Sequence, residues 1–309
     1  MPTATERTGA VPNDVERTQF GVVLMPTDPW AESVAVARRV EDLGYDHLWI
    51  FDHLTWRHYQ DRDWFGIYPW LAGMAASTER IGLGTMVANP NIRHPVILAK
   101  DAMTIDHISG GRMILGVGAG GIGYDATALG QQPLTPGQRV SRLDEYVTVL
   151  GGLLDGELTD HDGPWYTVNE ARMHPGCVQK PRLTVAVAAG HRRSIGVAAA
   201  KGDAWITNGI TWLDDLTPEK HLAVIADQVD IFNQACADLG RDPAKVRRIV
   251  QINNVEGRPL ASLDSFDEAV KQFEALEFTD IVFQHPRPDD PFWNDPPEMI
   301  DAIAERYLG

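Results

Sequence analysis

Short apolar runs alternate with longer amphipathic segments from residue 20 to the end of the sequence. The apolar runs are five to eight residues long and apolar on both faces, which is typical of parallel strands covered by helices. Eight strands are predicted, at Phe20–Met25, His47–Phe51, Arg80–Val87, Met113–Val117, Leu183–Ala188, Asp203–Thr207, Val246–Asn253 and Asp280–Gln284.

The segments between these strands have the spacing of helices, with apolar residues every three or four positions. Helices are predicted at Trp30–Gly44, Pro69–Ser77, Pro95–Ile108, Gln138–Leu154, Arg192–Lys201, Pro218–Leu239, Phe266–Leu276 and Pro297–Leu308. Eight strand–helix units without a dividing linker predict an α/β fold, a single (β/α)8 TIM barrel.

Two segments fall outside this alternation. Residues 1–18 are polar and carry Pro2 and Pro12, so we expect a flexible tail in front of one barrel domain at 19–309. Asp155–Val178 follows the fourth unit and contains an Asp-Gly turn, Asp162 and Gly163, between β-prone runs. This pattern predicts a short hairpin excursion.

The fourth predicted strand ends in a glycine-rich stretch. Gly116, Gly118 and Gly121 fit G-x-G-x-x-G, but that fingerprint should open a helix at the first strand–helix turn. Here it lies in the middle of the chain and precedes a predicted loop, Ile122–Gly137. A tight turn and another ligand-binding use of the glycines both stay open.

The active site of a barrel of this kind lies at the C-terminal ends of its strands. The residues found there in this sequence are Asp52, His53, Trp56, Met86, Val87, Asn89, Gly118, Ala119, Gly120, Gly121, Ala188, Ala189, Gly190, His191, Asn208, Gln284 and His285. His53 suits a base, a hydrogen-bond donor or a metal ligand. Ala188–His191 leads into a helix, where a phosphate cradle or a plain loop would both fit.

An aromatic-rich loop, Leu54–Tyr68, follows the second strand. Its Trp56, Trp64 and Phe65 are candidates for a substrate-binding wall, and loop packing is the alternative. The loop lies at the predicted barrel mouth, so it would help to set the substrate.

Composition narrows the classes of function. Lys and Arg number 27 against 43 Asp and Glu, and a net charge of −16 argues against nucleic acid as a partner. No apolar run is long enough to span a membrane. Cys177 and Cys236 make neither a disulfide framework nor a cysteine metal site, so a reducing cytoplasm is expected. The ten histidines are scattered, and we predict no metal site.

Several ordered motifs resemble one family. TERIGLGTMV, HPVILAKDAMTIDHISGGR, GVGAG and GxxYTVxxARxxPxxVQKPR are similar to the luciferase-like monooxygenase superfamily, the bacterial-luciferase-like flavin and deazaflavin oxidoreductases. The similarity spans roughly Phe20 to Val250. A later segment, AxxGRDPAKVRRIV, resembles a branch that depends on coenzyme F420, a deazaflavin.

The resemblance implies roles for the residues at the barrel mouth. Asp52 and His53 would be catalytic and face the cofactor ring, and Met86-Val87 would form a non-prolyl cis peptide behind it. Trp56 would shape the substrate side. The other implied cofactor contacts are Asn89, Gly118, Ala119, Gly120, Ala188, Ala189, Gly190 and His191. The resemblance also implies a homodimer.

The implied activity is F420-dependent hydride transfer to or from a small organic substrate, at a C=C, C=N or alcohol/carbonyl group. His53 would exchange the paired proton. An FMN-dependent monooxygenase, a non-catalytic flavin-binding relative and a metal-dependent hydrolase are the alternatives, and the histidine spacing disfavours the last. Gly121 stands where many relatives have an aromatic or acidic residue, which puts a sugar-phosphate substrate in doubt.

Overall fold

Parallel strands close into a barrel in this computed structural model, which describes residues 17–56, 59–156, 158–209, 216–252 and 257–309. The order around the barrel is β1-β10-β9-β8-β7-β4-β3-β2. The strands are β1 (Gln19–Leu24), β2 (His47–Ile50), β3 (Gly82–Thr85), β4 (Met113–Val117), β7 (Thr184–Ala188), β8 (Ala204–Thr207), β9 (Arg247–Gln251) and β10 (Asp280–Gln284). The predicted barrel is therefore confirmed.

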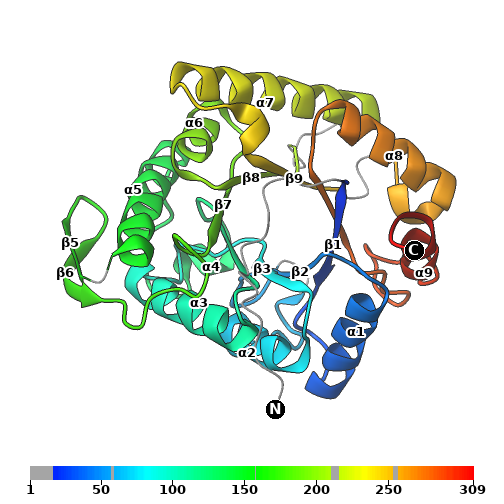
Figure 1. Ribbon diagram of the computed structural model, residues 1–309, viewed down its shortest axis with the longest axis horizontal. Helices are drawn as coiled ribbons and strands as arrows, with labels where there is room; N and C mark the ends of the chain where they lie inside the picture. Colours follow the sequence, from blue (N-terminus) through cyan, green and yellow to red (C-terminus); the bar gives the residue numbers. More distant parts are fainter. Residues whose placement is uncertain (1–16, 57–58, 157, 210–215, 253–256) are drawn as a thin grey trace, which may run out of the picture.

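Helices form a ring around these strands (Figure 1). The ring consists of α1 (Trp30–Asp42), α2 (Ile67–Ser77), α3 (Pro95–Ser109), α5 (Pro136–Asp155), α6 (Arg192–Lys201), α7 (Pro218–Asp238), α8 (Leu263–Ala275) and α9 (Met299–Tyr307). The short helix α4 (Tyr124–Thr127) lies inside this ring (Figure 1). Most of the predicted tail, residues 1–16, and the predicted strand end at Asn253 lie outside the described residues.

The hairpin excursion lies where the sequence predicts it, after the fourth unit. β5 (Leu158–Asp162) and β6 (Thr167–Arg172) pair antiparallel and lie outside the helical ring, beside α5 (Figure 1). The Gly163 amide donates to the carbonyl oxygen of Tyr166 at 3.0 Å and closes the turn. Glu145 of α5 accepts from the backbone amide of Tyr166 at 2.8 Å, which ties the hairpin to the barrel.

Two predicted segments need correction. The expected strand Arg80–Val87 is regular only over β3, because the chain then leaves the ladder and rejoins β4 at an isolated bridge from Ala88 to Val117. The expected loop Ile122–Gly137 contains α4 and the start of α5. A capping box at Thr135, with Pro136 in the first turn, starts α5 two residues earlier than the apolar spacing alone predicts.

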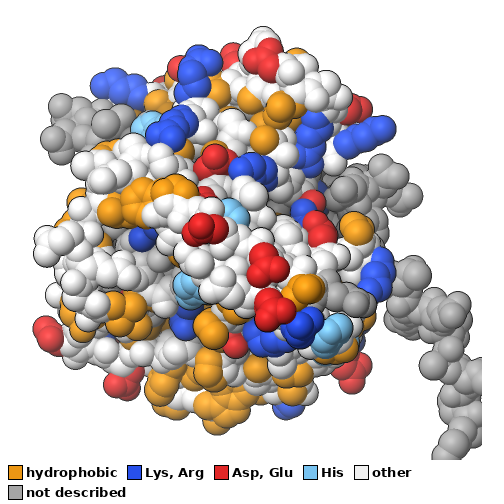
Figure 2. Space-filling model, turned by 90° about the vertical axis from the view of Figure 1, so that its left-hand side faces the viewer, with side chains coloured by type: hydrophobic (Ala, Val, Ile, Leu, Met, Phe, Trp, Pro, Cys, Tyr) orange, Lys and Arg blue, Asp and Glu red, His pale blue; other side chains and the backbone are white. Residues whose placement is uncertain are grey.

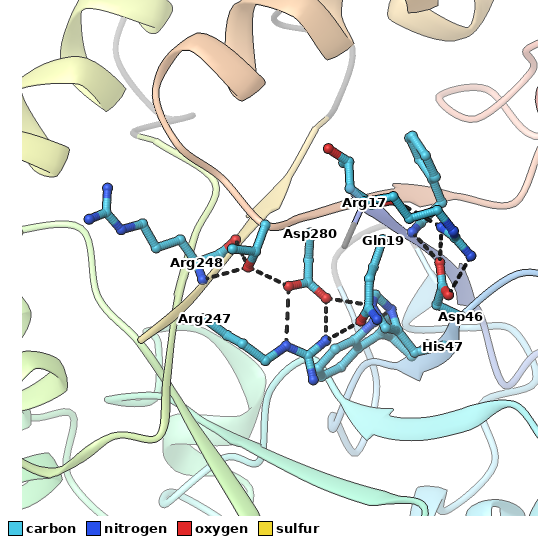
Figure 3. A network of polar contacts seen from close by, with 11 residues as sticks. Arg17, Gln19, Asp46, His47, Arg247, Arg248 and Asp280 are labelled. Carbon is cyan, nitrogen blue, oxygen red and sulfur yellow. Dashed lines mark hydrogen bonds and ion pairs between the residues drawn. The ribbon is translucent and has the colours of Figure 1, made fainter. Parts of the chain in front are cut away.

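The barrel interior has a polar floor at the N-terminal ends of the strands (Figure 3). Gln19, His47, Arg247 and Asp280 each begin their strand. Asp280 accepts from His47 Nε2 at 2.7 Å and from Arg247 Nε at 3.2 Å, and Arg247 Nη2 also contacts Asp280 Oδ1. Arg247 Nη2 donates to Gln19 Oε1 at 2.8 Å. Ligands of such barrels bind at the opposite end, which is formed by the C-terminal ends of the strands.

Candidate active site

The apolar interior of the barrel ends in aromatic side chains at the C-terminal mouth. Val23, Trp49, Met86, Ile206 and Val282 are among the buried residues of this interior cluster. The partly buried side chains packed against it are Trp56, Trp64, Val87 and Ala188. The structure thus brings together side chains that the sequence placed at the ends of three different strands, the second, third and fifth.

His53 is held at this mouth by an acidic residue from a distant part of the chain. Its Nδ1 lies 2.5 Å from Asp125 Oδ2, and the side chain remains 28% exposed. Asp125 belongs to α4 and also accepts from the amide of Leu54 at 2.9 Å and from Asn89 Nδ2 at 3.0 Å. Because those two groups can only donate, Asp125 acts here as an acceptor.

The arrangement fixes which nitrogen of His53 carries a proton. An accepting Asp125 oxygen requires an Nδ1–H on the imidazole, so in the neutral ring Nε2 is the acceptor. The Trp56 ring stacks on His53 at 5.9 Å between ring centroids, and Trp64 meets it edge-on at 6.0 Å. His53 therefore has the geometry of a group that takes or gives a proton at Nε2.

Asp52, predicted to be catalytic, lies deeper than His53. Arg93 donates to its two oxygens at 3.0 and 3.2 Å, and the amide of Asn89 donates at 3.2 Å. The Arg93 guanidinium also lies over the Tyr68 ring, 4.6 Å from its centroid. Burial raises the pKa of Asp52, and Arg93 opposes that shift. Because the Asp52 carboxylate is buried and paired with Arg93, a role in positioning the site residues is favoured over a catalytic role.

Asn89 joins the two carboxylates through different atoms. Its backbone amide binds Asp52 and its side-chain amide binds Asp125, while Oδ1 accepts from the amide of Asn91 at 3.0 Å. Its side-chain oxygen and nitrogen therefore both have protein partners. The contact to a cofactor that the resemblance implies for Asn89 stays a prediction.

The glycines after β4 have close protein neighbours. A Cβ on Gly118 would lie 2.5 Å from Val87 Cγ2, and one on Gly116 would lie 2.0 Å from the Thr85 carbonyl oxygen. Gly120 has a positive φ of 73°, and a Cβ on it would lie 2.9 Å from Arg142 Nη2. These glycines let β3 and its continuation approach β4, so a turn and packing role is favoured over direct ligand contact.

The peptide between Met86 and Val87 is cis, as the resemblance implied. Met86 belongs to the buried interior cluster and Val87 packs against it. Ala119, another predicted cofactor residue, has no polar atom in its side chain. Its carbonyl oxygen accepts from Arg142 Nη2 at 3.1 Å.

The predicted phosphate loop leads into α6, with His191 as the residue before the helix. Its carbonyls are held from neighbouring elements, since Trp205 Nε1 donates to Ala189 at 2.9 Å and Gln228 Nε2 donates to Gly190 at 2.8 Å. Arg193 donates to the Gly137 carbonyl and so ties α6 to α5. Hydrogen bonds from Trp205 and Gln228 therefore hold the loop in place, and its phosphate-binding role stays a prediction.

The three predicted substrate-side aromatics separate into two groups. The ring centroids of Trp56 and Trp64 lie 6.3 Å apart, and both rings contact His53. Phe65 is 42% exposed and stacks on Trp70 of α2 at 5.0 Å. We therefore assign Phe65 to packing on the helix ring rather than to the wall around His53.

Asp125 was not predicted, because it lies in the segment expected to be a loop. A signal was present nonetheless, since Asp125 is four residues beyond Gly121, the position where the resemblance leads one to look for an acidic residue. Within the described ranges, no group of three His, Cys, Asp or Glu side chains could hold a metal ion. None of the described helices is long and apolar enough to cross a membrane.

The residues around His53 fit a planar aromatic cofactor. Trp56 and Trp64 supply aromatic surface, and Gln284 at the end of β10 has a buried amide without a hydrogen-bond partner in the described structure.

On the face drawn in Figure 2, which carries α5 and the hairpin, acidic and basic side chains are intermixed.

Comparisons with known proteins identify the family of this chain. The family model described as luciferase-like monooxygenase matches residues 10–285. A 5,10-methylenetetrahydromethanopterin reductase of Methanolobus tindarius is 30% identical over 242 residues, 75% of this chain and 69% of the relative. An F420-dependent glucose-6-phosphate dehydrogenase of Microbacterium testaceum is 30% identical over 192 residues, 62% of this chain and 54% of the relative.

A solved structure shares the fold. The coenzyme F420-dependent tetrahydromethanopterin reductase of Methanopyrus kandleri superposes with a TM-score of 0.72 at 16% identity, covering 94% of this chain and 99% of that chain. At this identity the likeness concerns the barrel alone. The family match spans most of the sequence, so the chain is an oxidoreductase that belongs to the luciferase-like monooxygenase family, as its motifs predicted.

Proposed function

We propose that this protein is an F420-dependent oxidoreductase that transfers hydride between the deazaflavin and a small organic substrate. The observation that carries the proposal is His53, oriented by Asp125 and flanked by Trp56 and Trp64 at the mouth of the barrel. An F420-dependent dehydrogenase is among the relatives, which supports F420 as the cofactor.

The chain's own residues supply the proton chemistry. Coenzyme F420, when bound, would supply or take up the hydride. When His53 is an imidazolium, it gives the accompanying proton from Nε2 and becomes neutral, so that a C=C, C=N or C=O bond gains one hydride and one proton. The oxidation of an alcohol or amine is the reverse, with Nε2 as the base. Asp125 binds Nδ1 and so orients the ring, which leaves Nε2 for the proton transfer.

The remaining polar residues keep the mouth in place. Arg93 neutralises the buried Asp52, and Asn89 ties Asp52 to Asp125. Trp56 and Trp64 exclude water from one side of the imidazole, which favours an apolar substrate. The acidic residue nearest to the Gly121 position, Asp125, is already bound to His53, so a sugar phosphate is a weaker candidate than a hydrophobic molecule.

Two variants of His53 test this function. His53→Ala should slow hydride transfer by roughly 10²–10⁴-fold, the usual worth of a general acid or base, and leave the affinity for F420 nearly unchanged. His53→Gln controls for lost packing against Trp56. Equal turnover of His53→Ala and wild type would remove His53 from the mechanism.

FMN-dependent monooxygenation is the second candidate, because the family model itself is described as a luciferase-like monooxygenase. Titration of the cofactor-free protein with F420 and with FMN distinguishes the two candidates.

We also propose a homodimer that acts in the cytoplasm, with a small molecule rather than a nucleic acid or a membrane as its partner. Sedimentation of the purified protein tests the dimer.

A further inference from the structure

Gln284 stands at the mouth end of an inward-facing row of side chains on β10. Val282, two residues earlier, belongs to the interior cluster, whereas Ile281 and Phe283 belong to the outer core between barrel and helices. Because side chains alternate along a strand, Gln284 points into the barrel above Val282. Asp280, at the other end of the same row, forms part of the polar floor (Figure 3).

The side-chain amide of Gln284 is buried without a partner. The residue is 3% exposed, and neither Oε1 nor Nε2 has a hydrogen-bond partner among the described residues. Gln179 is equally buried, yet its Nε2 donates to Asp106 Oδ1 at 2.7 Å and to the Met113 carbonyl at 2.8 Å. An unpaired buried donor and acceptor cost folding free energy, so a ligand that pairs both would recover that cost.

A second unpaired group lies in the same sector of the mouth. Trp64 Nε1 is buried without a hydrogen-bond partner in the described part of the chain. The next residue, Phe65, donates its amide to the Pro26 carbonyl at 2.8 Å, just beyond β1. β1 pairs with β10, with Val23 opposite Gln284. Trp64 therefore contacts His53, and the backbone beside it is bound next to β1, the strand that pairs with β10.

We propose that Gln284 is a ligand-binding residue that takes a planar amide-type edge, in which a carbonyl oxygen and an N–H lie side by side. A carboxamide pairs with such an edge through two parallel hydrogen bonds, as glutamine does with adenine. A ligand with a single acceptor or donor would leave one atom of Gln284 orphaned. The indole N–H of Trp64 adds a donor for a further acceptor.

This inference rests on the proposed function, because the edge belongs either to the substrate or to the pyrimidine imide of the cofactor ring. Both sources present the same chemistry to Gln284. The ring imide is common to F420 and FMN, so the inference does not depend on which of the two binds.

The first test compares two buried glutamines in the ligand-free protein. Gln284→Leu removes an amide with no partner, so its unfolding midpoint should equal or exceed that of wild type. Gln179→Leu removes an amide with three partners, Asp106, Met113 and Thr184, and should lower the midpoint. A midpoint for Gln284→Leu as low as that of Gln179→Leu would show that the Gln284 amide is paired within the protein and overturn the proposal.

The second test distinguishes the sources of the edge. F420 is titrated into wild type and into Gln284→Leu, and binding is followed by fluorescence. Succinimide, a cyclic imide, is titrated into the same two proteins with and without F420. If the cofactor provides the edge, Gln284→Leu weakens F420 binding at least tenfold and FMN binding similarly. If the substrate provides it, F420 affinity is unchanged, and Gln284→Leu abolishes the succinimide binding of wild type.

The outcomes separate this inference from the proposed function. Wild type that fails to bind F420, yet binds FMN or succinimide in a Gln284-dependent way, contradicts F420 dependence and still supports the Gln284 site. Equal affinity of wild type and Gln284→Leu for every probe, or no binding of any probe by wild type, overturns the inference.

Discussion

The carboxylate of Asp280 is the central charge of the barrel floor, and its removal should be among the most destabilising changes in the chain. Asp280 is fully buried and Arg247 is 2% exposed. In Asp280→Asn the Arg247 guanidinium keeps its charge but loses its carboxylate, and an amide N–H₂ faces the guanidinium donors. Breaking a buried pair on one side costs about 3–5 kcal/mol. That is a large share of a total stability of about 5–15 kcal/mol.

Urea unfolding followed by tryptophan fluorescence measures this cost. With a slope of roughly 3 kcal/mol per molar urea, the midpoint of Asp280→Asn should fall by roughly 1–1.7 M. Asp301→Asn is the matched control, because Asp301 pairs with Arg39 at the surface, with side chains 48% and 59% exposed. An exposed pair contributes less than about 1 kcal/mol. Equal midpoints for Asp280→Asn and Asp301→Asn would refute the reasoning.

The same pair predicts a pH dependence. Burial alone would raise the pKa of Asp280, but Arg247 and His47 hold it well below its ordinary value of 3.8. A lowered folded-state pKa adds stability above the unfolded-state value and loses it as pH falls through the folded-state value. The difference in unfolding free energy between wild type and Asp280→Asn should stay constant between pH 5 and 8 and narrow below about pH 4. A difference that narrows above pH 5 would contradict this assignment.

Two further predictions concern the mouth. In Asp125→Asn, the amide N–H₂ can donate to Nδ1 of His53, so the neutral ring should become a mixture of the two tautomers. The ¹⁵N chemical shifts of neutral His53 should then move away from those of the Nδ1-protonated form. Unchanged shifts would show that Asp125 does not set the tautomer. Gly118→Ala should cost about 1–3 kcal/mol by thermal unfolding, because its Cβ meets Val87 at 2.5 Å, whereas Gly121→Ala meets no atom within 4 Å; equal melting temperatures would contradict the packing role.

The barrel was predictable from the sequence because its strands are local apolar runs. Each of the expected strands has a counterpart, and the errors lie at their ends. β3 is shorter than its apolar run because the chain leaves the ladder after Thr85 and rejoins at Ala88. The start of α5 depends on the capping box at Thr135, a polar signal that apolar spacing does not register.

The contacts of the site were less predictable, because they join distant segments. His53 and Asp125 are 72 positions apart, and nothing local to either residue indicates their contact. Phe65 and Trp64 are adjacent in sequence, yet one stacks on α2 and the other faces His53. The glycine stretch was visible, but the Val87 side chain that requires Gly118 comes from another strand end.

The most direct test of the proposed function is a pair of binding titrations. Cofactor-free protein is titrated with F420 and, separately, with FMN, and binding is followed by fluorescence. The account predicts tight binding of F420 and much weaker binding of FMN. Tight binding of FMN alone would contradict hydride transfer from a deazaflavin and direct the search to oxygenated products instead.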